Sequence, residues 1–333
     1  MQTWVSNSLN FVIGFLFFCI IEYILGPELI KKIEIWGVNS LNNTIINIFP
    51  EFHIILDEYI LWIVLFFIAS CLLKILFWLK NSIFLISEVS MGYKLAKVAK
   101  DKNGRYIFSS VLNVNEEMSN NKIADAVKKQ DEFINKFIKR YKFADIGYYG
   151  IAHTPLVFRA GFLVGDQDNV HLYHKLRKND SLFKEWIDDS TSFSFMNGIT
   201  KLPQKNSIDS NELIVAISSS LDIQECEIAK LHPENKHLIF FKGNEIGFDY
   251  IISYQDAEKA REFIWSNVRS YVKKHNIQKL HLVIASSVAF TFFLGMGYSR
   301  QHDPECIVYH YERPDYKWGI NIKKDSSECF VEL

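Results

Sequence analysis

The stretch LHLVIASSVAFTFFLGM, residues 280–296, decides the fold of the C-terminal part of this chain. It opens with a short apolar run rich in β-branched side chains, passes through Ser286 and Ser287, and continues as a second apolar run. A short apolar run without alternation is typical of a strand covered on both faces, and the second run fits a short buried helix. This order of strand, polar turn and helix predicts an α/β fold with a largely parallel sheet.

A related stretch, IGYYGIAHTPLVFRAGFL at residues 146–163, stands earlier in the chain. When the two are aligned, Gly161 falls on Gly295 and His153 on Ser287, so that both pairs differ by 134 positions (295 − 161 and 287 − 153). A constant offset across a strand, a turn and a helix indicates an internal repeat. We therefore expect two related α/β repeats in tandem, the first in residues 105–205 and the second in residues 206–333.

The flanking segments follow the same order in both repeats. Apolar runs predict three strands in each repeat: residues 105–114, 145–152 and 170–174, then 212–217, 279–285 and 306–311. Amphipathic patterns predict one long helix in each repeat, at residues 116–141 and 255–275. We expect a helical connector at residues 82–104 to lead into the first repeat.

The first 81 residues have a different composition. Two apolar runs, residues 4–26 and 59–79, contain one charged residue each, Glu22 and Lys74. About 20 helical residues at ~1.5 Å rise span a bilayer core of ~30 Å, so the runs predict a hairpin of two transmembrane helices joined by an external linker. Either both charges reach the nearer membrane surface, or Glu22 faces a water-filled lumen in an assembled cluster.

Basic residues near the helix ends indicate the orientation of this hairpin. The linker carries Lys31 and Lys32, whereas more basic residues follow the second run: Lys80, Lys94, Lys97, Lys100, Lys102 and Arg105. Because basic flanks stay in the cytoplasm, we expect the C-terminal domain and the N-terminus to be cytoplasmic in a multi-pass membrane protein.

Charge, cysteines and motifs exclude several functions. The net charge of −1 gives no overall attraction to a DNA or RNA duplex, so a nucleotide ligand must be small and held in a pocket. The five cysteines are scattered, without zinc-ligand spacing, and the chain lacks P-loop, GxGxxG, HExxH and GxSxG motifs. We therefore expect no metal, no cofactor, no catalytic residue and no enzymatic activity.

Small polar residues follow several of the predicted strands: His153, Thr154, Ser218, Ser219, Ser220, Ser286 and Ser287. In open α/β sheets, ligands bind at the carboxyl ends of the strands, where helix N-termini present unsatisfied N–H groups. Each residue alone is explained equally well as a helix N-cap. Matched loops in two repeats favour a pseudo-two-fold pocket for a ligand with repeated phosphates.

The pattern YYGIAHTPLVFRAGFL, and more specifically HLVIASSVAFTFFLGMGY followed by ECIVYHYERPDYKWGINI, resembles the SAVED domain. That domain is a fusion of two CARF-like, Rossmann-type halves, and the similarity covers about residues 105–333. With two apolar helices in front, the whole chain is similar to the two-transmembrane SAVED effectors of bacterial CBASS anti-phage systems.

This resemblance implies an activating ligand, a cyclic di- or trinucleotide made by a cognate nucleotidyltransferase. It places the phosphate and ribose contacts at the seven loop residues named above. Base stacking would fall to aromatic faces, with Trp186, Tyr309, Tyr311 and Trp318 as candidates. Arg159 and Arg313 are candidates for phosphate neutralisation, and an ordinary solvated arginine is the alternative for each.

The resemblance further implies that the ligand causes homo-oligomerisation. The clustered helices would then disrupt the lipid of the inner membrane and abort the infection. Two alternatives stay open. The chain is a membrane-tethered enzyme that cleaves the cyclic nucleotide and ends the signal, with His153 as base, or its helices are a passive anchor for a sensor.

Overall fold

The computed structural model describes residues 66–77, 82–90, 105–113, 120–142, 144–167, 170–175, 183–189, 191, 194–195, 199–201, 210–247 and 250–333. The chain divides into two compact bodies, Met1–Ile75 and Leu76–Leu333. The first predicted transmembrane run, the external linker and Glu22 lie outside the described residues.

Residues 66–77 form a helix inside the second predicted run. Its large apolar side chains are exposed, with exposed fractions between 48% and 67%. They are Phe66, Phe67, Ile68, Leu72, Leu73, Ile75, Leu76 and Phe77. Among the described helices, none has both the length and the hydropathy needed to cross a bilayer.

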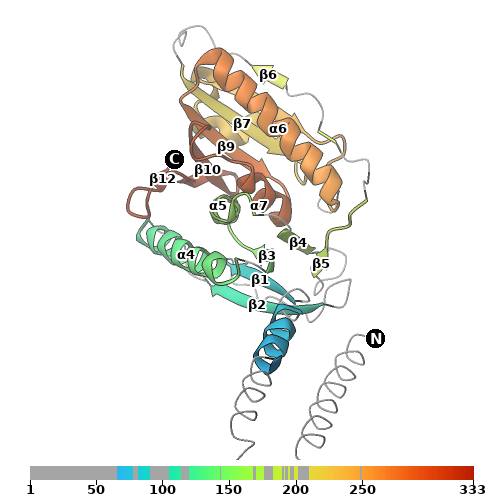
Figure 1. Ribbon diagram of the computed structural model, residues 1–333. Helices are drawn as coiled ribbons and strands as arrows, with labels where there is room; N and C mark the ends of the chain where they lie inside the picture. The colour runs from blue at the N-terminus through green and yellow to red at the C-terminus, as the bar shows by residue number, and fades with distance from the viewer. Residues whose placement is uncertain are drawn as a thin grey trace, which may run out of the picture. The chain divides into compact units, whose positions relative to one another are not determined.

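The first repeat is built on a five-stranded sheet with strand order β2-β1-β3-β4-β5 (Figure 1). Its strands are β1 (Ser82–Val89), β2 (Tyr106–Asn113), β3 (Asp145–Ile151), β4 (Val170–Lys175) and β5 (Phe183–Glu185). The first four are parallel, and β5 runs antiparallel to β4. Its helices are α4 (Asn120–Arg140) and α5 (Thr154–Val164).

The start of this sheet corrects the expected helical connector at residues 82–104. Its first eight residues form β1, whose side chains are all buried, between the parallel strands β2 and β3. Such a strand has no polar face and no alternation, and Ser87 and Glu88 also interrupt the apolar run that would otherwise indicate a buried strand. The first repeat therefore begins at Ser82.

The second repeat has a seven-stranded sheet with strand order β12-β11-β10-β9-β7-β8-β6. Its strands are β6 (Ile199–Lys201), β7 (Glu212–Ser218), β8 (His237–Lys242), β9 (Lys279–Ala285), β10 (Glu305–Glu312), β11 (Asp315–Asn321) and β12 (Phe330–Glu332). Its helices are α6 (Tyr254–His275), α7 (Val288–Met296) and the short 3-10 helices η3 (Glu225–Leu231) and η4 (Pro233–Asn235). The strands β8, β7, β9 and β10 are parallel, and the outer strands are antiparallel to their neighbours.

The two sheets confirm the predicted duplication. The order β8-β7-β9-β10-β11 repeats the order β2-β1-β3-β4-β5, with an antiparallel last strand in both. β3 and β9 have seven residues each, and both ends differ by 134 positions (279 − 145 and 285 − 151). The predicted strands and long helices of both repeats are present at or near their expected bounds.

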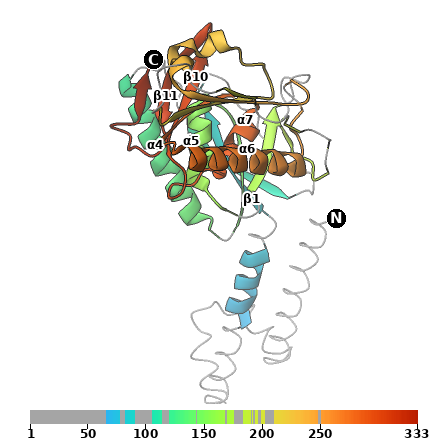
Figure 2. The ribbon, with the colours of Figure 1, turned by 90° about the horizontal axis from the view of Figure 1, so that it is seen from above.

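The repeats meet where α5 crosses α7, and the two helices lie side by side in both views (Figures 1 and 2). A Cβ atom at Gly161 would overlap the carbonyl oxygen of Phe292, and one at Gly295 would overlap that of Phe158. Phe292 and Phe158 are themselves 134 positions apart, so the contact is reciprocal. Two glycines at equivalent positions thus let the helix backbones touch on a pseudo-two-fold axis.

Buried side chains extend this junction into both repeats. The ring of Tyr148, on β3, stacks on that of Phe292, on α7, at 4.0 Å between centroids. Arg159, on α5, is 3% exposed and donates to both carboxylate oxygens of Asp131 on α4, at 3.0 and 2.8 Å. It also donates to the carbonyl oxygen of Ile322 at 2.9 Å. Arg159 therefore joins the two repeats, so it is neither the candidate phosphate contact nor the solvated arginine that the sequence left open.

Candidate functional site

The loops that follow the central strands have the same geometry in the two repeats. In the first, the N–H of Ser90 after β1 donates to the carbonyl oxygen of Ile151 on β3, at 3.1 Å. In the second, the N–H of Ser219 after β7 donates to the carbonyl oxygen of Ala285 on β9, at 3.0 Å. Adjacent parallel strands end at the same edge of a sheet, so each repeat collects polar residues at its carboxyl edge.

In the first repeat, Ser90 holds His153 in place at the start of α5. The Ser90 hydroxyl lies 2.7 Å from Nδ1 of His153 and accepts the backbone N–H of His153 at 2.7 Å. His153 is the N-cap residue of α5, yet its side chain makes no capping hydrogen bond. The ring and Thr154 are half-buried at this carboxyl edge.

In the second repeat, serine hydroxyls hold the loops together. Ser218 Oγ accepts the N–H of Ile223 at 3.1 Å, and Ser219 Oγ lies 2.6 Å from Ser286 Oγ. Ser218, Ser219 and Ser220 are between 2% and 5% exposed, whereas Ser286 and Ser287 are half-buried. Ser287 also accepts the N–H of Phe290 at 3.2 Å, so it is the N-cap of α7. The loop after β9 therefore offers the accessible hydroxyls.

An aromatic cluster joins the first repeat's loop to the second repeat. The His153 ring lies 4.6 Å from the ring of His310, on β10, and 5.7 Å from that of Trp318, on β11. Trp318 is 4% exposed, and its Nε1–H donates to Glu312 at 2.9 Å. Within the described part of the chain, His310 is 8% exposed and its Nδ1 has no hydrogen-bond partner.

Burial keeps both imidazoles of this cluster neutral. It lowers the pKa of His153 to about 4, against an opposing effect of Glu312. Burial, followed by the nearby His153, lowers the pKa of His310 to about 3. Both rings are thus uncharged at neutral pH, when one nitrogen of each ring is a donor and the other an acceptor. Nδ1 of His153 is already engaged by Ser90 and Nδ1 of His310 is buried, which leaves the Nε2 atoms for a ligand. The cluster is suited to hydrogen bonding with a base or a ribose rather than to neutralising phosphate charge.

Other predicted stacking residues lie elsewhere. Trp186 is fully buried and packs edge-on against Tyr254 and Phe293, at 5.4 and 5.9 Å between centroids. Tyr309 is 1% exposed, and its hydroxyl lies 2.9 Å from Nδ1 of His281. The structure therefore places these two rings in the core, because each lies where sheet and helices pack, and neither presents a face to a base.

Two further predicted residues, Tyr311 and Arg313, lie at the end of β10 and in the turn that follows it. The hydroxyl of Tyr311, half-buried on β10, donates to Glu227 of η3 at 2.8 Å. Arg313 is exposed in the turn between β10 and β11.

Other residues at the carboxyl edges of the two sheets were not predicted from the sequence. Ser90 was not predicted because β1 was expected to be a helix. Once β1 is matched to β7, Ser90 is equivalent to Ser219. In the second repeat, Leu221 and Tyr250 are 55% and 41% exposed. Tyr250 lies over Gly247, whose N–H donates to the carbonyl oxygen of Ser219 at 2.8 Å. This exposed aromatic ring beside the serine loop offers a surface for stacking, and no local sequence pattern predicts it.

Two α/β repeats that share the order of five strands, with a helix crossing between them and matched polar loops, define a duplicated Rossmann-type domain. The family model of SAVED, "SMODS-associated and fused to various effectors sensor domain", matches residues 130–322, more than half of the chain. The chain belongs to this family. β1 and β2 lie before the matched range.

Solved structures share the fold. The Cap4 SAVED/CARF-domain receptor of Acinetobacter baumannii with the cyclic trinucleotide 3'3'3'-cAAA matches 77% of this chain and 53% of its own, with 14% identity and a TM-score of 0.51. The same receptor with 2'3'3'-cAAA matches 72% of this chain and 51% of its own, with 14% identity and a TM-score of 0.51. This chain thus spans about half the length of these structures. Among curated proteins, no similar sequence was found.

Proposed function

We propose that this chain is a CBASS effector whose SAVED domain binds a cyclic oligonucleotide, with a cyclic trinucleotide as the first candidate. The observation that carries the proposal is the pair of equivalent carboxyl edges related by the α5/α7 crossing. A cyclic oligonucleotide presents similar phosphates in several directions. Such a ligand suits a site that is formed by equivalent loops of the two repeats. The structurally similar Acinetobacter baumannii receptor is described with two cyclic trinucleotides, which supports this ligand class.

The accessible groups fit the parts of such a ligand. The N-termini of α5 and α7, with Thr154, Ser286 and Ser287 beside them, would donate to phosphates and ribose oxygens. The neutral ring of His153 and the exposed ring of Tyr250 would contact bases from the two repeats. The buried Ser218, Ser219 and Ser220 would act by shaping the loop.

The N-terminal helices would be the output of this receptor. The described helix at residues 66–77 exposes apolar side chains around most of its surface, a pattern that suits lipid rather than water. Together with the apolar run at residues 4–26, it would form the hairpin that anchors the chain in the inner membrane. Ligand that binds the assembled form more tightly would shift the chain into clusters and disrupt the membrane.

The proposal is tested by titrating 3'3'3'-cAAA into the full chain in detergent and measuring its mass by light scattering. The mass should rise with ligand. Ser286→Asp should weaken binding by at least about tenfold, because a carboxylate at the ligand loop repels phosphate. Ser270→Asp, on the exposed face of α6, should behave as the wild type. An unchanged mass with cyclic di-, tri- and tetranucleotides alike would contradict the proposal.

A second function, cleavage of the ligand, is favoured by the contact between Ser90 and His153. Nδ1 is engaged by Ser90 Oγ at 2.7 Å, which orients the neutral ring. With the ring proton on Nδ1 and donated to Ser90 Oγ, Nε2 would take the proton of a ribose 2'-hydroxyl, whose oxygen attacks the adjacent phosphate. The bond from phosphorus to the 5'-oxygen breaks, and the imidazolium returns the proton to that oxygen. The products would be a 2',3'-cyclic phosphate and a 5'-hydroxyl. Linear products that appear with the wild type and not with His153→Ala would establish cleavage, and intact ligand would exclude it.

A further inference from the structure

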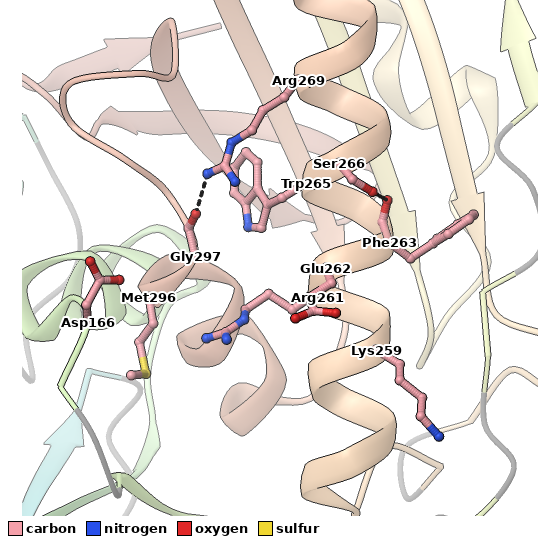
Figure 3. A pocket seen from close by; sticks show the side chains of 10 residues that line it. All are labelled: Asp166, Lys259, Arg261, Glu262, Phe263, Trp265, Ser266, Arg269, Met296 and Gly297. Carbon is pink, nitrogen blue, oxygen red and sulfur yellow. Dashed lines mark hydrogen bonds between the residues drawn. The ribbon is translucent and has the colours of Figure 1, made fainter.

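A cavity of about 770 Å³ lies beside α6, away from the loops described above (Figure 3). It is lined by α6 residues, by Met296 and Gly297 at the end of α7, and by Asp166 just after α5. The N-terminal ends of α5 and α7 carry the candidate ligand loops, so this cavity lies at the opposite ends of the same two helices. It belongs to neither of the loop clusters.

Arg261 reaches into this cavity with its donors unused. Its side chain is 22% exposed, and its guanidinium lies over the ring of Phe293 at 4.0 Å from the centroid. Its nearest carboxylate, that of Glu258 on the same helix, is 3.9 Å away and 60% exposed. No hydrogen bond from the Arg261 guanidinium is formed within the described residues. In Figure 3 the guanidinium points between α6 and Met296, into the cavity.

The neighbouring arginines differ in this respect. Arg269 donates to both carboxylate oxygens of Asp303 at 2.8 Å and to the carbonyl oxygen of Gly297 at 2.7 Å. Arg159 likewise has three acceptors, as described above. The Arg261 side chain is partly buried, but its nitrogens are not among the buried side-chain atoms that lack a partner in the described residues, so they face the cavity and are available to an acceptor that enters it. Burial lowers the pKa of Arg261, against opposing effects of Glu258, Glu262 and Asp166.

We propose that this cavity binds a small phosphate ester of a sugar, with the phosphate on Arg261. A guanidinium that lies over an aromatic ring and makes no hydrogen bond within the described residues keeps its N–H groups available for an oxyanion, which it can bind with two parallel hydrogen bonds. The cavity also contains the carboxylates of Asp166 and Glu262, which repel a bare anion and accept hydrogen bonds from hydroxyl groups. A ligand that carries both a phosphate and hydroxyls therefore fits better than inorganic phosphate.

Isothermal titration of the full chain in detergent with ribose 5-phosphate, at matched ionic strength, tests this site. We expect saturable binding that Arg261→Gln weakens by at least about tenfold, which is about 1.4 kcal/mol. Arg261→Lys should also lose affinity, because it keeps the charge and lacks the planar donor edge. Arg300→Gln, an exposed arginine outside the cavity lining, should bind as the wild type does.

Other results would overturn the proposal. These are the absence of saturable binding to the folded wild type, equal affinity in Arg261→Gln, and ribose that binds as tightly as ribose 5-phosphate. Tighter binding of inorganic phosphate than of ribose 5-phosphate would show that Asp166 and Glu262 do not accept hydrogen bonds from ligand hydroxyl groups. The site does not depend on the cyclic oligonucleotide, so either function can fail while the other stands. Circular dichroism of each variant separates loss of the site from loss of the fold.

Discussion

Glu88 shows how one residue inside the first repeat makes stability depend on pH. It is fully buried on β1, where its carboxylate accepts from Tyr148 Oη at 2.8 Å and from Gln130 Nε2 at 2.6 Å. Burial raises the pKa of Glu88 to about 7, although both hydrogen bonds act in the opposite direction. The unfolded chain loses this proton near pH 4.5 and the folded chain only near pH 7, so folding takes up a proton between these values.

A raised pKa in the folded state of an acid removes stability as pH rises. The contribution of Glu88 to the free energy of unfolding is therefore fully present below about pH 4.5 and declines until about pH 7. Relative to Glu88→Gln, the wild type should lose about 2 kcal/mol of unfolding free energy between about pH 5 and about pH 8. Urea unfolding of both proteins at the two pH values measures this difference.

The comparison with the variant is necessary because buried histidines act in the opposite direction. Burial lowers the pKa of His153 and His310, so the stability of their neutral forms is lost as pH falls. Both proteins share this contribution, and it cancels in the difference. A difference that does not change with pH would show that Glu88 is not the titrating group.

At the scale of elements, the α5/α7 crossing is the contact that the sequence alignment indicates most directly. Gly161→Ala or Gly295→Ala would drive a methyl group into a backbone carbonyl, which no rotamer change relieves. We expect each to destabilise the protein by about 3 kcal/mol, the upper range for overpacking. Because both methyl groups force the same two helices apart, the double variant should lose less than the sum. Denaturant unfolding measures the loss, with Ser270→Ala on α6 as control, and additive losses would contradict a shared crossing.

The elements also show where sequence reasoning succeeds and where it fails. The repeat offset predicts β3, β9, α5 and α7, because a strand, a polar turn and a glycine recur at fixed spacing. β1 was missed because only Lys80 and Asn81 separate it from the second apolar run, and because Ser87 and Glu88 interrupt its own apolar residues. A buried strand that carries polar side chains inside its apolar run is recognised by its partners, which are distant in sequence.

The position of β1 makes the boundary of the domain testable. A chain that begins at residue 105, where the repeat pattern starts in the sequence, lacks the strand between β2 and β3 together with Glu88. It should show no cooperative unfolding transition. A chain that begins at residue 81 keeps the complete sheet and should unfold cooperatively, as followed by near-UV circular dichroism. Cooperative unfolding of the shorter chain would mean that β1 is dispensable.

At the scale of the whole molecule, the loops of the candidate site were predictable, whereas its aromatic residues were predictable only in part, since Trp318 lies beside His153. Serine and histidine after apolar strands identify the carboxyl edge from local order alone. Whether an aromatic ring faces a ligand depends instead on packing between distant elements, and packing places Trp186 and Tyr309 in the core while it exposes Tyr250. Site residues that act by position on the fold are thus easier to predict than those that act by exposure.

Ligand sensing and membrane damage should be separable along the chain. If the two repeats drive assembly, a chain of residues 81–333 should still gain mass with 3'3'3'-cAAA, because both ligand edges and the α5/α7 crossing remain. It should release no dye from liposomes, whereas the reconstituted full chain should do so when the cyclic ligand is added and not with a linear trinucleotide. Binding without leakage by the full chain would make the helices a passive anchor. If the shorter chain did not gain mass with ligand, oligomerisation would instead depend on contacts between the apolar helices.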